Sequence, residues 1–476
     1  MTEQVKLTMR DKPLYRWAAL ILLSATMFFA YMFVDVLSPL QANLQELRGW
    51  DPSAYGHFAG SEMFLNVFVF FLIFAGIILD TIGARRTAIL SGVVMVLGAL
   101  VKYFAISEAF IGSSAEAWFS NNLNFPSEWW NITPFYAGMP ASAKMAAVGF
   151  MIFGCGVEMA GITVSRAIVK WFRGYEMALA MGLEMAIARI GVAVVVLLGP
   201  KALGMGGVID ISRPVLLCTA LVFIGLLSLI AFFFMDRKLD REVGASNEEK
   251  DDPFKPKDLV SLFTSPTFLI VALLCVLYYS AIFPFQKYAI NMLQCNLQIS
   301  AEDAGMIFFW FPLGAAAITP FLGNFLDRRG KGASMLIIGA VLMIVCHLTF
   351  AFLPHISSSL ATPVALGAIV LLGISFSLVP ASLWPSVPKL VDERLLGSAY
   401  AVIFWIQNIG LYSLPMVIGA VLRSSNPGVE DPLLYNYTQP MLVFASLGVA
   451  ALVLAFVLKA MDRKKGYGLE LPNVKE

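Results

Sequence analysis

Two side chains of opposite charge, Glu158 and Arg189, stand near the middle of consecutive apolar segments of this 476-residue chain. A charge at the centre of a lipid-embedded helix costs roughly 2.5 to 3.5 kcal/mol on insertion scales, so such residues mark polar cavities or ion pairs. A carboxylate can receive an ammonium group, and a guanidinium holds a carboxylate through two parallel hydrogen bonds. The couple therefore suits the two ends of a zwitterion. A simpler interpretation is that the two residues only neutralise one another as a buried ion pair.

Three ionisable residues in other apolar segments are weaker candidates. Asp35 lies four residues before Pro39, and we expect it to face the protein interior, where it could bind a solute or carry a proton. His347 could also carry a proton, although a packed interior histidine is the commoner situation. Besides Asp35 and His347, Glu158 itself could take part in proton coupling. Lys287 ends an apolar segment and is expected to anchor it at the membrane interface.

Aromatic and amide side chains within the apolar segments could form the walls of a cavity. Trp384 precedes a proline, which interrupts a helix, and Trp405 precedes a polar patch. Irregular backbone inside a membrane requires a cavity or protein neighbours, which favours these two positions. The candidate wall residues are Tyr31, Tyr278, Tyr279, Trp384, Trp405, Gln407 and Asn408.

Composition dictates the elements that must position these residues. Apolar residues make up 59% of the chain, charged residues only 14%, and the mean hydropathy is +0.77. These values predict an all-α membrane protein. Apolar runs of about 20 residues give twelve expected transmembrane helices. They are 17–40, 57–79, 87–106, 144–168, 177–200, 214–235, 260–288, 304–326, 333–354, 362–388, 397–422 and 439–460.

The charged residues predict how these helices are divided and oriented. Most of the 33 Lys and Arg residues fall on the side that carries both termini, which by the positive-inside rule is the cytoplasm. A densely charged stretch separates six helices from six. The expected parts are a tail at 1–16, a six-helix bundle at 17–235 with an extended outer loop at 107–143, a linker at 236–257, a second bundle at 258–460 and a tail at 461–476.

A short loop motif occurs once in each half of the chain, after the second and the eighth expected helix. The first copy contains Gly76, Asp80, Gly83, Arg85 and Arg86. The glycines would allow close helix approach and a tight turn, and the aspartate can accept hydrogen bonds from arginines. The second copy contains Gly323, Asp327 and Arg328, with its arginines placed before the next glycine.

Further similarities support an internal duplication. Pro39-Leu40-Gln41 matches Pro284-Phe285-Gln286, and Arg189-Ile190-Gly191 matches Asn408-Ile409-Gly410. We therefore expect two pseudo-symmetric six-helix bundles. In this repeat the positions of Glu158 and Arg189 correspond to the uncharged Ser377 and Asn408.

The twelve spans, the central linker and the two loop motifs resemble the major facilitator superfamily over the whole chain. The resemblance implies a transporter whose loop aspartates and arginines latch helices on the cytoplasmic side, which would make Asp80, Arg85 and Arg86, with Asp327 and Arg328, gate residues. Arg85 and Arg86 could also serve only to fix the topology.

More specific segments resemble the branch of this family that contains the lysosomal dipeptide transporter. They are 171–176, 182–191, 383–385, 397–400 and 406–410, with Asp35 and Glu158 in similar settings. The resemblance implies dipeptide transport, with Glu158 and Arg189 in the central cavity. Alternatives are a carrier of organic or inorganic anions that uses Arg189, and a receptor that does not transport.

Several classes of protein and site are not indicated by the sequence. The five cysteines suggest neither disulfides nor a metal cluster, and no nucleotide-binding or zinc-hydrolase motif occurs, so we expect no enzyme, cofactor or metal. The basic residues form no face for nucleic acid. The expected partners are a small solute, the lipid bilayer and, for a coupled carrier, protons. We expect a monomer in a bacterial inner membrane or a plasma membrane.

Overall fold

The computed structural model describes residues 8–126, 132–243, 261–392 and 395–472, and within these ranges all regular structure is helical. The longer helices of the amino-terminal half are α1 (Pro13–Asp35), α6 (Ala84–Ile106), α8 (Ala141–Phe172), α9 (Met177–Leu203) and α10 (Ser212–Val243). Those of the carboxyl-terminal half are α12 (Pro266–Leu297), α14 (Trp310–Arg329), α15 (Gly332–Phe352), α16 (Ser358–Leu383), α18 (Leu396–Ser425) and α19 (Thr438–Lys465).

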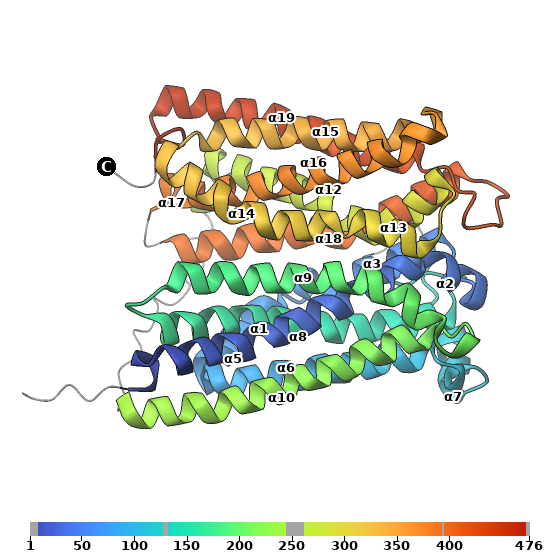
Figure 1. Cartoon of the computed structure of the whole chain (residues 1–476), viewed down its shortest axis with the longest axis horizontal. Coiled ribbons are helices and arrows are strands. Elements are labelled where there is room, and N and C mark those ends of the chain that lie inside the picture. Colours follow the sequence, from blue (N-terminus) through green and yellow to red (C-terminus); the bar gives the residue numbers. More distant parts are fainter. Residues whose placement is uncertain (1–7, 127–131, 244–260, 393–394, 473–476) are drawn as a thin grey trace, which may run out of the picture.

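These helices form two groups that lie side by side (Figure 1). We call them the N bundle, which comprises the helices from α1 to α10, and the C bundle, which comprises those from α12 to α19. Helix α1 begins and α19 ends on the same side, the terminal face, and α2 (Gln41–Arg48) and α7 (Ser114–Asn121) lie on the opposite side, the insert face. The expected all-helical membrane fold is confirmed, with eleven described helices long and apolar enough to cross a membrane.

The second expected span, 57–79, is divided among α3 (Pro52–Ser61), α4 (Phe64–Phe68) and α5 (Phe71–Ile82), of which α5 is too short to be counted as a span. The break before α5 falls at Phe70, whose φ of +55° is the left-handed conformation that L-residues adopt only at a cost. Apolar composition alone gives no sign of such a break.

The expected boundaries also shift at three places. Helix α1 begins at Pro13, inside the expected tail, and α19 extends to Lys465. Residues 236–243, expected to begin the linker, continue α10 as a helix, and residues 244–257 lie outside the described part of the chain. The outer loop 107–143 contains α7, and the Lys144 ammonium group donates to the carbonyls of Phe119 and Asn122 at 3.1 and 3.0 Å.

The two bundles are tightly packed near the insert face. A side-chain carbon added at Gly56 of α3 would collide with the carbonyl oxygen of Pro415 in α18, and one at Gly419 would collide with that of Pro52. The hydroxyl of Tyr55 also donates to the carbonyl of Lys287 in α12 at 2.8 Å. Helices approach this closely only where small residues allow it. The insert face is therefore closed between the bundles.

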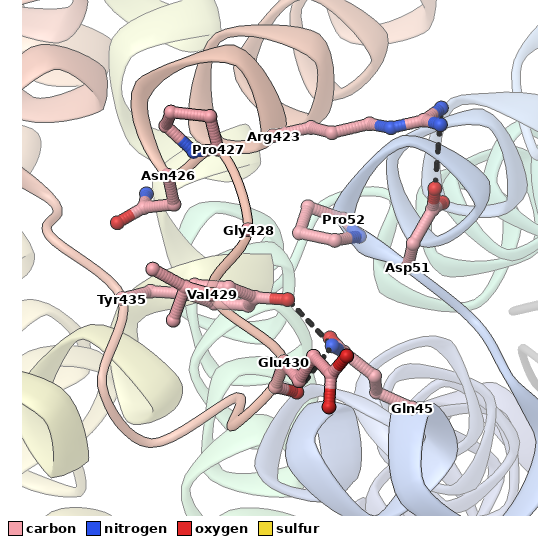
Figure 2. A pocket seen from close by; sticks show the side chains of 10 residues that line it. All are labelled: Gln45, Asp51, Pro52, Arg423, Asn426, Pro427, Gly428, Val429, Glu430 and Tyr435. Atoms are coloured by element: carbon pink, nitrogen blue, oxygen red, sulfur yellow. Dashed lines mark hydrogen bonds and ion pairs between the residues drawn. The ribbon is translucent and has the colours of Figure 1, made fainter.

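A shallow pocket of about 500 Å³ lies over this closed seam (Figure 2). On one side Asp51 and Arg423 form an ion pair of 3.2 Å between α3 and the end of α18. On the other the Gln45 amide donates to the hydroxyl of Tyr435 at 2.5 Å. The two bundles therefore meet through polar groups at the rim of the seam and through glycines below that rim.

Packing differs on the terminal face. A side-chain carbon at Gly76 of α5, or at Gly323 of α14, would meet no atom within 4 Å. The close helix approach that we expected at Gly76 is therefore not present, whereas Gly83 has a φ of +82° and makes the expected tight turn. Because the seam is tight at Gly56 and Gly419, the structure is closed toward the insert face.

Candidate functional site

Arg189 reaches from α9 in the N bundle to the C bundle. Its Nη1 donates to the hydroxyl of Thr319 in α14 at 2.9 Å and approaches the carbonyl of Ala315 at 3.5 Å. Its guanidinium lies 4.8 Å from the ring centroid of Phe376 in α16. A cation over an aromatic face is stabilised by the ring quadrupole. All these partners are neutral, so the guanidinium retains the capacity to bind an anion.

Glu158 lies on α8 and, like Arg189, is half-buried. Among the described residues it makes no hydrogen bond and no ion pair, and it is not paired with Arg189. The interpretation that the two residues neutralise each other in a buried ion pair is therefore wrong for this structure. Each is a charged group between helices that lacks a counter-charge in contact.

Tyr31 is close enough to both charged residues to interact with them electrostatically. It lies on α1 and is half-buried, and it interacts electrostatically with Glu184, Glu158, Glu62 and Arg189. Its hydroxyl is thus placed among the buried charges of this bundle.

Aromatic side chains of the C bundle form the surface next to Arg189. Tyr279 of α12 stacks on Phe283 with centroids 5.5 Å apart and meets the edge of Phe376 at 6.2 Å. Its hydroxyl accepts from the indole N–H of Trp384 at 3.0 Å. Two of the expected wall residues, Tyr279 and Trp384, therefore belong to one cluster with Phe376, the ring that the Arg189 guanidinium contacts.

Three other expected wall residues point elsewhere. The hydroxyl of Tyr278 donates to the carbonyl of Leu336 inside the C bundle. Gln407 accepts from the Cys275 thiol at 3.3 Å, again inside that bundle. Trp405 donates to the carbonyl of Val67 at 3.0 Å and lies across the bundle boundary, at the break before α5. None of these three hydrogen bonds is made to Arg189 or to Phe376.

The remaining candidates are also held in the C bundle. Asn408 is buried at 3% exposure in α18. His347 is buried among Phe285, Phe350 and Phe444, and its Nε2 lies 3.1 Å from the carbonyl of Ala281. A histidine enclosed by aromatic rings lacks an evident proton path, so the geometry does not favour the proton-coupling hypothesis for His347.

Asp35 is buried at the junction of the bundles. It is paired with Lys287 of α12 at 2.8 Å, and both side chains are nearly buried, at 5% and 12% exposure. The expectation that Asp35 faces the interior agrees with this structure. Lys287 is not the interfacial anchor that we expected, because it crosses to the other bundle.

The first loop motif forms ion pairs within the N bundle. Asp80 pairs with Arg166 of α8 at 2.5 Å, and Arg85 pairs with Asp240 of α10 at 2.7 Å. Arg86 is exposed, as are Asp327 and Arg328 of the second motif. The pairs of Asp80 and Arg85 thus join helices of one bundle in this state, and a latch between the bundles stays a prediction.

Sequence reasoning missed three residues that the structure places at these sites. Thr319 and Phe376 touch Arg189, and Lys102 is buried close to the Asp35 pair. Two of them carried a usable signal: Lys102 is a charge inside an expected span, and Thr319 is a hydroxyl before a proline inside an apolar segment. Across the described part of the chain, no group of three His, Cys, Asp or Glu residues could hold a metal ion.

A comparison with protein families decides the broad assignment. The model of the Major Facilitator Superfamily matches residues 23–411 and 288–471 of this chain. The chain belongs to the Major Facilitator Superfamily. It is therefore a membrane transporter by family, as the loop motifs and the helix count indicated.

Curated relatives within this family are named lysosomal dipeptide transporter MFSD1. The chain is 28% identical over 288 residues to that of Mus musculus, covering 58% of this chain and 59% of the relative. It is 29% identical over 283 residues to that of Homo sapiens, with 58% and 59% covered. The alignments thus span about three fifths of the length of these relatives.

Solved structures share the fold at low sequence identity. A nucleoside transporter, NupG, aligns with a TM-score of 0.65 at 14% identity, covering 93% of this chain and 98% of that one. A D-xylose-proton symporter aligns at 0.65 and 12% identity, covering 94% and 98%. A structure described under substrate recognition in proton dependent oligopeptide transporters aligns at 0.61 and 14%, covering 94% and 99%. These similarities show the fold alone.

Proposed function

We propose that this protein carries dipeptides or similar small zwitterions across a membrane by alternating access between its two bundles. Arg189 binds the carboxylate of the solute and Glu158 its ammonium group. The observation that carries the proposal is that both charged side chains are half-buried and neither touches a group of opposite charge. A bound zwitterion supplies both missing counter-charges at once.

The neighbours of Arg189 suit a site that is loaded and emptied. Thr319 and the ring of Phe376 hold the guanidinium while the site is empty, and neither supplies a negative charge that would compete strongly with a carboxylate. Tyr279 and Trp384 give the adjoining wall an apolar face with polar edges. The names of the MFSD1 relatives support the same class of solute.

The packing of the bundles supports alternating access with the terminal face as the open side. That face is the cytoplasmic one by the distribution of Lys and Arg, so we assign this structure to an inward-facing state in a bacterial inner or plasma membrane. Outward opening requires the glycine seam and the Asp35–Lys287 pair to separate.

Two alternatives fit less of the site. A carrier of simple anions would use Arg189 but would leave the Glu158 carboxylate without a role near a negatively charged solute. A receptor that does not transport would need no second conformation, whereas the seam of this structure closes one face only.

The decisive experiment compares three solutes in proteoliposomes: dialanine, N-acetyl-dialanine and dialanine amide. Acetylation removes the ammonium group, and amidation removes the carboxylate. A lost charged hydrogen bond is worth about 1.5 to 3 kcal/mol, so each analogue should have a half-saturation concentration roughly 10- to 150-fold above that of dialanine.

Two variants assign the ends of the solute. Glu158→Gln should weaken dialanine uptake and abolish its advantage over the acetylated analogue, and Arg189→Gln should abolish its advantage over the amide. Glu184→Gln is the matched control, because Glu184 is a buried acid on α9 that lies about 140° around the helix from Arg189. Equal preference of the parent protein for all three solutes would overturn the proposal, and competition by simple anions alone would favour the anion carrier.

A further inference from the structure

Lys102 of α6 is a buried cation that the proposed solute site does not use. Its side chain has 0% exposure. The ammonium nitrogen lies 4.4, 5.1 and 4.3 Å from the ring centroids of Phe33, Phe58 and Phe150, and it donates to the carbonyl of Phe33 at 3.3 Å. No carboxylate lies within 4 Å of it among the described residues. A lysine enclosed in this way is costly unless a negative charge compensates it.

Lys287 approaches the same place from the other bundle. Its ammonium group contacts Asp35 at 2.8 Å and the carbonyl of Val34 at 3.1 Å, and it lies 5.6 Å from the ring of Phe150. The two lysines therefore donate to consecutive carbonyls of α1 and share one aromatic ring.

The end of helix α1 explains why cations gather here. Helix α1 ends at Asp35, and the last four carbonyls of a helix lack intrahelical partners and carry the negative end of the helix dipole. Asp35 adds a full negative charge at that point. Glu62, at the end of α3, is a second acid at this place, since it is buried at 7% exposure and interacts electrostatically with Lys287, Asp35 and Lys102.

The acids and lysines of this cluster come together from both bundles only while the insert face is closed. Asp35, Glu62 and Lys102 belong to the N bundle, whereas Lys287 belongs to the C bundle. Opening of the insert face must carry α12 away from α1, because Lys287 and its neighbours form part of the closed seam. Asp35 would then be a buried carboxylate whose contacting cation has left.

We propose that Lys102 is a positioning residue that takes the place of Lys287 beside Asp35 when the insert face opens. The exchange needs only a short movement, since Lys102 already donates to the carbonyl two residues before Asp35. In the closed state Lys287 neutralises Asp35 and Lys102 rests on the aromatic rings. In the open state Lys102 neutralises Asp35 from within the same bundle. The inference rests on the alternating access that we propose, but not on the identity of the solute.

The test measures how often the insert face opens, without any transported solute. Ser38 is 2% exposed, and its hydroxyl donates to the carbonyl of Gln286 across the seam at 3.3 Å. In a Ser38→Cys background, a membrane-impermeant maleimide applied from the insert face reacts only with open molecules. The five native cysteines are buried, and the protein without Ser38→Cys gives the background rate.

Lys102→Met should slow labelling at least about tenfold, because the open state then contains an uncompensated buried carboxylate. Lys102→Arg should retain the parent rate within about threefold. Lys287→Met is the matched variant, and it should accelerate labelling because it weakens the closed state.

A lysine that only supports the fold would give a different pattern. In an Asp35→Asn background the carboxylate charge is gone, so Lys102→Met should change labelling less than about threefold, and this comparison remains valid if the single variant folds poorly. Equal slowing in both backgrounds, or unchanged labelling in Lys102→Met, would overturn the proposal. Failure to transport dialanine would leave these rates unaffected, so the two proposals fail separately.

Discussion

The glycine seam at the insert face makes a sharp prediction about Gly56→Ala. The added methyl carbon would collide with the carbonyl oxygen of Pro415 and would lie 2.8 Å from the hydroxyl of Tyr288. A backbone oxygen cannot rotate away as a side chain can, so α3 and α18 must separate. Overpacking of this kind costs about 1 to 3 kcal/mol, and here it is paid only in the closed state. The population open at the insert face should therefore rise roughly 5- to 150-fold relative to the closed one.

Distance measurements between spin labels would report this shift. Leu47 of α2 and Leu434 of the loop after α18 are exposed on the N and C sides of the seam and can carry the labels as Leu47→Cys and Leu434→Cys. Gly367→Ala is the control, because a side-chain carbon at Gly367 of α16 meets no atom within 4 Å. An unchanged distance distribution in Gly56→Ala, or the same change in Gly367→Ala, would refute the account of the closed seam.

Three further predictions concern other contacts. Thr319→Val removes a neutral acceptor that competes for Arg189, so dialanine should bind about 2- to 10-fold more tightly by calorimetry, and weaker binding would contradict this role. The hydroxyl of Tyr175 donates to Asp11 and is the main reason that the pKa of Asp11 is lowered from 3.8 to about 2. A carboxyl whose pKa is lowered in the folded state stabilises that state above about pH 4, and this stabilisation is lost as the pH falls toward 2. Tyr175→Phe should therefore increase carbodiimide labelling of Asp11 near pH 3, and a labelling titration identical to that of the parent protein would contradict the prediction. Glu470→Ala removes the carboxylate that accepts from the backbone N–H of Ser334, in the first turn of α15, at 2.7 Å. The variant should lower the free energy of unfolding by about 0.5 to 2 kcal/mol and reduce the melting temperature, and an unchanged melting temperature would contradict this role.

The helical fold could be predicted from the sequence because hydropathy and the loop motif are local signals. Apolar runs locate helices by length, and a repeated motif aligns the two halves. The break of the second span was hidden, since Phe70 is itself apolar and its left-handed backbone is held by stacking on Trp405 at 5.5 Å, a residue far away in the sequence.

The site could be predicted only in part, for a related reason. A charge inside an apolar segment is visible in the sequence, so Glu158, Arg189 and Asp35 could be selected. Their partners depend on how the bundles meet. Nothing local indicates that Lys287 pairs with Asp35, or that Arg189 contacts Thr319 instead of Glu158.

The same limit applies to glycines and aromatic residues. Gly76 belongs to a recognisable motif, yet its surroundings in this state are open, whereas Gly56 carries no motif and lies at the tightest part of the seam. Tyr278 and Tyr279 are adjacent, but a helix places neighbours about 100° apart, so only one can face Arg189. Which one does so is decided by tertiary packing.

A structure of the protein with dialanine bound would test the central claim most directly. We predict the carboxylate of the peptide within about 3 Å of the Arg189 guanidinium, with the Thr319 contact released, and its ammonium group within about 3 Å of Glu158. A peptide bound elsewhere, or one bound while Arg189 still donates to Thr319 and Glu158 stays without a contact, would contradict the account.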